Sequence, residues 1–128
     1  MRHEDIKKDV KKITKSIFEE IVNIRRWIHK HPELSFQEKN TSKYICSILN
    51  KYNIPFIHNI GGYGIVASIE SDTPNDRVIA IRADMDALPI QEKNDVTYKS
   101  INDGVMHACG HDVHTAIALG TAIVLNKL

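Results

Sequence analysis

Groups able to bind a metal ion gather in one eight-residue segment, which contains His107, Cys109, His111 and His114. Imidazole nitrogen and thiolate sulfur are ligands that zinc and similar transition metals favour. Cys109 and His111 flank a glycine, whose backbone freedom allows both side chains to turn toward one ion where a loop enters a helix. The segment therefore predicts a metal site, although it matches no zinc-finger pattern because it has no Cys-x-x-Cys pair.

Two other interpretations apply to the same segment. Cys109 is also suited to be a catalytic nucleophile, with His111 or His107 as the base that takes its proton. A histidine near the start of a helix is, in addition, often an ordinary capping or core residue. Removal of metal distinguishes a metal site from a catalytic thiol, because a thiol enzyme retains its activity after chelation.

Two aspartates follow the apolar run Val78–Ile81, which we expect to form a strand buried on both faces. Ligand sites in open α/β sheets lie outside the carboxyl ends of strands, so Asp84 and Asp86 are expected near such a site. One of these carboxylates can orient a metal-bound histidine, and the family resemblance given below, together with the position after the strand, leads us to expect that Asp86 points toward the loop of Cys109 and His111. The alternative is a purely structural role, because aspartate and proline are common where a strand ends and a loop begins.

Residues 25–38 form a third polar segment, which marks the end of one helix and the start of the next. His29 and His31 lie here, but their separation on a helix makes a shared metal ion unfavourable. Ser35 precedes Glu38 by three residues, which predicts a capping box at the start of the second helix.

The elements that must position these segments follow from the period of the apolar residues. Isoleucine and valine recur every three or four residues near the N-terminus, which predicts a long helix. Short β-branched runs bounded by turn residues predict strands. The expected helices span residues 4–30, 36–52 and 112 onward, and the expected strands span 54–57, 65–69 and 78–81. The order favours an α/β fold with a mixed sheet flanked by helices.

Composition excludes several classes of function. The chain has 128 residues, 42% hydrophobic and 26% charged, which suits one globular domain. A net charge of +1 predicts no nucleic-acid partner, and no apolar run is long enough for a membrane span. The N-terminus lacks a secretory signal and the two cysteines make no disulfide scaffold, so we expect a cytoplasmic protein.

Three segments together resemble one family. They read R-R-W-I-H-K-H-P-E-L-S-F-Q-E, I-R-A-D-M-D-A-L-P-I and G-V-M-H-A-C-G-H-D-V-H-T, and they cover residues 25–38, 81–90 and 104–115. In order and spacing they are similar to the amidohydrolase branch of the aminoacylase and carboxypeptidase G superfamily of metallopeptidases. That branch includes hippurate hydrolase, N-acetyldiaminopimelate deacetylase and the indole-acetyl-amino-acid hydrolases.

The resemblance implies a hydrolase that cleaves the amide bond of N-acyl amino acids, a class of small-molecule substrates, with two divalent metal ions. Manganese, zinc, cobalt or nickel would serve. By resemblance Cys109 and His111 are metal ligands and Asp86 is the catalytic aspartate. Asp84 stands where related branches have a metal-binding histidine, and the resemblance gives it no settled role. His107 and His114 belong to the motif but are not assigned as ligands.

The family's sequence continues with a Glu-Glu pair, which holds the general base and a ligand, then with ligand histidines and a lid domain. We therefore expect residues 1–128 to be the N-terminal portion of the catalytic domain, from a truncated or split gene, and to be inactive alone. The alternatives are a non-catalytic chain with a partial metal site and one half of a split enzyme. Association with another chain through an unpaired sheet edge is also expected.

Overall fold

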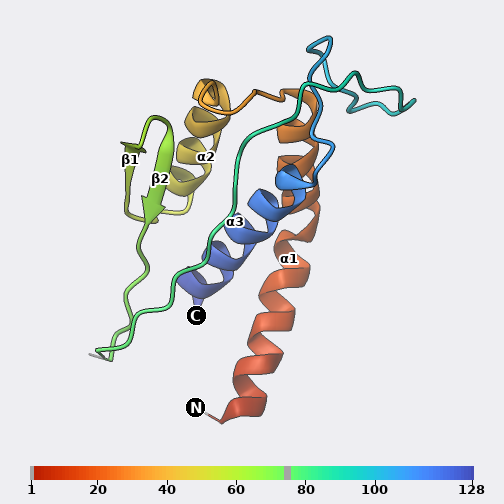
Figure 1. Cartoon of the computed structure of the whole chain (residues 1–128). Coiled ribbons are helices and arrows are strands. Elements are labelled where there is room, and N and C mark those ends of the chain that lie inside the picture. The colour runs from red at the N-terminus through yellow and green to blue at the C-terminus, as the bar shows by residue number, and fades with distance from the viewer. Residues whose placement is uncertain (1, 74–75) are drawn as a thin grey trace.

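The computed structural model describes residues 2–73 and 76–128. Three helices and one hairpin make up its regular structure (Figure 1). In chain order they are α1 (His3–Lys30), α2 (Lys39–Lys51), β1 (Phe56–Ile60), β2 (Gly64–Ala67) and α3 (His111–Lys127). The helices expected from apolar periodicity are all present, and the protein combines helices with a sheet, as an α/β fold requires. None of the helices among the described residues is long and apolar enough to cross a membrane.

The core forms chiefly where α1 packs against α3. Ile24 and Ile28 are almost fully buried on α1, and Ile123 on α3 is 1% exposed. Gly120 of α3 faces Ile21 of α1, and a Cβ atom added there would lie 3.4 Å from the Ile21 side chain, at the limit of ordinary van der Waals contact. The helix α2 contributes further apolar side chains to the same core, namely Ile45 and Leu49. The isoleucine stripe that predicted α1 is therefore also the surface that holds α3 in place.

The first turn of α2 is stabilised by Glu33, not by the expected capping box. The helix begins at Lys39, and Glu38 at its N-cap position makes no side-chain capping bond. The backbone N–H groups of Asn40 and Thr41 donate instead to the Glu33 carboxylate, at 3.1 and 2.6 Å. A carboxylate suits this place because the helix N-terminus carries unpaired N–H groups and partial positive charge. The capping-box prediction was wrong because Ser35 bonds to a distant residue.

Replacing Glu33 by alanine is expected to lower the free energy of unfolding by about 1–2 kcal/mol, the usual cost of losing a helix cap. Urea unfolding followed by circular dichroism measures this change. Glu19→Ala is the control, because Glu19 is exposed in the middle of α1 and its loss should cost under about 0.5 kcal/mol. Equal effects of the two substitutions would show that Glu33 does not cap α2.

The two expected strands near residues 54–69 form an antiparallel hairpin, in which Phe56 pairs with Ala67 and Ile57 with Val66. Gly61 and Gly62 form the turn with positive φ angles of 59° and 112°, which glycine adopts without steric cost. The hairpin is the whole sheet in the described part of the chain.

The run Val78–Ile81 does not form the buried strand that its composition predicts. It has no regular secondary structure, and Val78 and Ile79 are 92% and 89% exposed. An apolar run becomes a central strand only when neighbouring strands satisfy its backbone on both sides. Among the described residues no strand pairs with it, so the expected mixed sheet is limited here to the antiparallel hairpin.

The extended segment that follows is fixed between the end of α1 and the start of α3 (Figure 1). The N–H of Ala87 donates to the Glu33 carbonyl at 2.8 Å, and Leu88 exchanges backbone bonds with Met106. The Thr115 hydroxyl on α3 donates to the Asp84 carbonyl at 2.8 Å. These bonds bring the two-aspartate segment against the cysteine–histidine segment.

Candidate metal centre

The loop before α3 presents Cys109 and His111 at the entrance of the helix. His111 is the first residue of α3, and Gly110 before it has a φ of 91°, in the left-handed region. Most residues are strained in that conformation, whereas glycine adopts it readily. The Cys109 side chain is a free thiol on an exposed residue. The sharp turn at Gly110 is therefore the local feature that lets this segment change from loop to helix between two candidate ligands.

Asp86 contacts His111 directly, in the direction that the sequence predicted, although the strand on which that argument rested does not form. The Nδ1 atom of His111 lies 2.8 Å from Asp86 Oδ1 and 3.0 Å from the Asp86 carbonyl oxygen. Because both partners are acceptors, Nδ1 carries the proton and donates it. The lone pair then lies on Nε2, the tautomer in which a histidine binds metal while a carboxylate orients its ring.

Ser35 completes this arrangement from the turn between α1 and α2. Its hydroxyl donates to Asp86 Oδ2 at 2.5 Å. This hydrogen bond is the main reason that the pKa of Asp86 is lowered; the hydrogen bond and charge of His111 add to it, against the opposing effect of burial. Both oxygens of Asp86 are thus engaged, and its carboxylate is held ionised in one orientation.

His107 and His114 differ in their surroundings. His107 is 4% exposed, and neither ring nitrogen has a hydrogen-bond partner among the described residues. Burial is the main cause that lowers the pKa of His107 to about 4, so its ring is neutral at pH 7. His114 is exposed one turn along α3, with its ring centroid 6.2 Å from that of His111.

The donors present fit a metal ion in type but not in number. Cys109 offers a thiolate and His111 a free Nε2, both suited to zinc and similar ions. In residues 2–73 and 76–128, however, no three histidine, cysteine or acidic side chains lie close enough together to hold one ion. Structural zinc sites usually have four ligands and catalytic sites three plus water. The described residues thus supply part of a ligand set.

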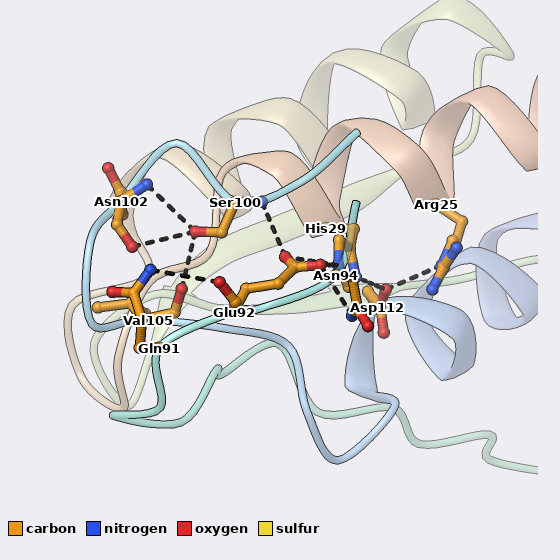
Figure 2. Close-up of polar contacts among 9 residues, drawn as sticks. All are labelled: Arg25, His29, Gln91, Glu92, Asn94, Ser100, Asn102, Val105 and Asp112. Carbon is orange, nitrogen blue, oxygen red and sulfur yellow. Dashed lines mark hydrogen bonds and ion pairs between the residues drawn. The ribbon is translucent and has the colours of Figure 1, made fainter. Parts of the chain in front are cut away.

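His29 and His31 do not share a site, in agreement with the sequence-based expectation. His31 stacks on Trp27 with ring centroids 4.2 Å apart, and its Nδ1 donates to the Trp27 carbonyl. His29 lies instead in a buried cluster with Glu92 and Asp112 (Figure 2).

The contacts of two residues in and beside this site, Ser35 and His29, were not predicted from the sequence. Ser35 was interpreted as a helix cap, although it lies 51 positions from its partner Asp86. His29 was treated as an ordinary residue at a helix end, although it bonds partners 63 and 83 positions away. Their only sequence signal was membership of the first polar segment, residues 25–38, because no local pattern reports contacts over such separations.

Comparisons with known proteins show which proteins the chain is similar to. Residues 80–128 match the family described as peptidase family M20/M25/M40. The chain is 43% identical over 122 residues to an N-acyl-L-amino acid amidohydrolase of Geobacillus stearothermophilus, covering 95% of this chain and 33% of that protein. It is 47% identical over 116 residues to an N-acetylcysteine deacetylase of Bacillus subtilis, covering 88% and 30%.

The fold is similar to that of a solved structure. The crystal structure of Bacillus subtilis YxeP, described as a dinuclear metal binding peptidase from the M20 family, superimposes with a TM-score of 0.83 and 46% identity. The match covers 88% of this chain and 32% of that one. The chain thus spans about a third of the length of these relatives. In sequence and fold, it is a relative of the amidohydrolases of peptidase family M20/M25/M40.

Proposed function

We propose that residues 1–128 form the N-terminal portion of the catalytic domain of a metal-dependent amidohydrolase, which hydrolyses the amide bond of N-acyl amino acids in the cytoplasm. One observation carries this proposal. The Asp86 carboxylate lies 2.8 Å from His111 Nδ1, which leaves Nε2 as the ring nitrogen available to a metal ion. The relative named an N-acyl-L-amino acid amidohydrolase supports the choice of substrate class.

In the proposed mechanism Cys109 and His111 would hold a divalent ion, and Asp86 and Ser35 fix the ligand geometry. When bound, two ions of manganese, zinc, cobalt or nickel would polarise the scissile carbonyl and supply hydroxide from water. The Asp86 carboxylate accepts a hydrogen bond from the Nδ1–H group of His111 and so keeps the ring in one tautomer and orientation. Ser35 donates to the other oxygen of Asp86 and prevents the carboxylate from rotating away.

A chimera tests this function. The present chain replaces the matching segment of the Bacillus subtilis N-acetylcysteine deacetylase, to which it is 47% identical. The chimera, loaded with manganese or zinc, is expected to hydrolyse N-acetylcysteine, and a chelator should abolish the reaction. Loss of groups that merely orient a ligand costs about 10–100-fold in metal affinity or activity. Cys109→Ala, which removes a ligand itself, should therefore lower turnover at least about 100-fold.

Cys46→Ala is the matched control, because Cys46 is a half-buried thiol on α2 and makes no contact with the candidate centre. It should leave turnover within about two-fold, the range expected for a substitution that costs little stability. A folded chimera that hydrolyses nothing would contradict the proposal. Activity that survives chelation but is lost in Cys109→Ala would instead show a thiol enzyme.

A second candidate, one half of a split enzyme, is favoured by the exposed run Val78–Ile81. Its exposed apolar side chains, and a backbone that pairs with no strand in the described part of the chain, are those of a strand that lacks neighbours. Under this hypothesis a separate chain supplies the neighbouring strands and the Glu-Glu pair. The next ~60 codons of the gene and the adjacent reading frames distinguish the two cases, since one further βα unit needs ~30 residues or more.

A further inference from the structure

A large apolar side chain is exposed beside the candidate centre. Phe36 lies in the turn between α1 and α2 and is 84% exposed. Among the described residues only Val78 and Ile79 are large apolar residues with a greater exposed fraction. Phe36 directly follows Ser35, whose hydroxyl donates to Asp86 Oδ2 at 2.5 Å. A phenylalanine is therefore almost fully exposed next to the residues that orient the candidate ligand.

The backbone of Phe36 has a conformation that phenylalanine rarely adopts. The N–H of Gln37 donates to the Leu34 carbonyl at 2.9 Å, which closes a four-residue turn with Phe36 in its third position. The φ angle of Phe36 is 64°, in the left-handed region. Turns that need a positive φ at the third position usually have glycine or asparagine there, because a bulky side chain is strained. Such strain is found most often at functional sites, where the surrounding contacts maintain it.

Contacts on both sides fix this turn in place. The N–H of Phe36 donates to Glu38 Oε1 at 2.9 Å, and Leu34 pairs with Ala87 in an isolated parallel bridge. Because Ala87 follows Asp86 directly, this bridge attaches the turn to the segment that carries the Asp86 carboxylate. The position of the Phe36 backbone relative to Asp86 is therefore fixed, and Phe36 is not part of the apolar core.

The ring of Phe36 is the part of this turn that a ligand can contact. Both oxygens of Asp86 already accept hydrogen bonds, one from Ser35 and one from His111. An exposed aromatic ring binds apolar groups because the contact removes apolar surface from water. It binds other rings in edge-to-face or offset stacks. The turn therefore offers an apolar contact at the edge of the candidate centre.

We propose that Phe36 contacts an apolar group of the substrate and selects N-acyl amino acids that carry a ring over those that carry none. This proposal rests on the proposed function, since it takes Asp86 and His111 as part of a hydrolytic centre. The ring of the substrate belongs either to the acyl group or to the amino-acid side chain, and the two experiments below distinguish these cases. Phe36 determines specificity and takes no part in cleavage of the amide bond.

The first test uses the 128-residue chain without metal, with its three phenylalanines replaced by 4-fluorophenylalanine. The ¹⁹F spectrum of Phe36→Leu assigns the signal of Phe36, which is missing there. N-phenylacetylglycine carries a ring in its acyl group, N-acetylphenylalanine carries one in its side chain, and N-acetylglycine has none. At millimolar concentration at least one of the two ring compounds is expected to shift the Phe36 signal, whereas N-acetylglycine should not shift it.

Phe18 is the internal control in this spectrum, because it is also an exposed phenylalanine, at 63%, and lies near the middle of α1. A compound that shifts the signal of Phe36 but not that of Phe18 shows which part of the substrate carries the ring. Equal shifts of the two signals, or no shift with either ring compound, would overturn the proposal. No hydrolysis is measured, so this result does not depend on enzyme activity.

The second test uses the chimera with the N-acetylcysteine deacetylase. Phe36→Ala is expected to lower kcat/KM for N-phenylacetylcysteine or for N-acetylphenylalanine about 10-fold more than for N-acetylcysteine, a factor of the order that one aromatic pair contributes. Phe36→Tyr keeps the ring and should retain the preference, and so should the control Phe18→Ala. An equal loss for all three substrates in Phe36→Ala would show that Phe36 only supports the fold. A chimera that hydrolyses none of the three contradicts the proposed function, and the ¹⁹F shifts then decide the role of Phe36 alone.

Discussion

The 128-residue chain by itself is expected to show no measurable metal-dependent hydrolysis of N-acyl amino acids. Its described residues bring no three ligand side chains together, so any ion bound through Cys109 and His111 would be held weakly. The resemblance also places the general base in a later Glu-Glu pair, and proton transfer by such a group contributes about 10²–10⁴-fold to rate. The measurement is release of a free amino acid from an N-acetyl amino acid after loading with manganese or zinc.

The active chimera described above is the positive control for this assay. Clear turnover by the isolated chain, abolished by Cys109→Ala, would show that the remaining two thirds of the relatives' length is not needed. Sedimentation of the same sample is informative, because the exposed run Val78–Ile81 should promote self-association.

Removal of the Asp86 carboxylate should have the second large effect. In the chimera, Asp86→Ala is expected to lower kcat by about 10²–10⁴-fold, the range for loss of a group that acts in proton transfer or ligand orientation, while KM changes less. The physical reason is that Asp86 is the acceptor that fixes the His111 ring. Steady-state kinetics on N-acetylcysteine, at saturating metal, separate the two parameters.

Asp103→Asn is the matched control, because Asp103 is an exposed aspartate in the loop before α3 and lacks a contact with the candidate centre. Its kcat should stay within about two-fold of the unsubstituted chimera, since surface changes of this kind cost little. An Asp86→Ala chimera with full activity would remove Asp86 from the mechanism. A change confined to KM would assign it to substrate binding instead.

The helices could be predicted from the sequence because their signal is local. Seven isoleucine and valine residues repeat at helical spacing through α1, and the same stripe is the face that α3 covers. The strand predicted at Val78–Ile81 did not form, because a strand exists only with a partner and composition does not say whether one is present. Local periodicity determines a helix, whereas a strand depends on residues elsewhere in a sheet.

The same distinction applies to the candidate site. Cys109 and His111 are two positions apart, so their spacing predicts that they share one ion, and this stays a prediction. The contact of Asp86 with His111 was expected from its place after an apolar run, and the structure confirms that contact; the catalytic role of Asp86 stays a prediction. The Ser35 contact and the buried cluster around His29 depend on how distant segments meet, which a single sequence does not report.

The packing of α1 against α3 has a consequence for synthesis of the chain. Ile24 and Ile28 are covered by residues of α3 that lie about 90 positions later in the sequence. At ~5–20 residues per second, the ribosome needs about 5–20 s to make that stretch, which is far longer than hydrophobic collapse takes. For this interval the apolar stripe of α1 is without its main cover and exposed to chaperones that bind such surfaces. Burial of the α1 stripe therefore waits for a helix that is made long after α1 itself.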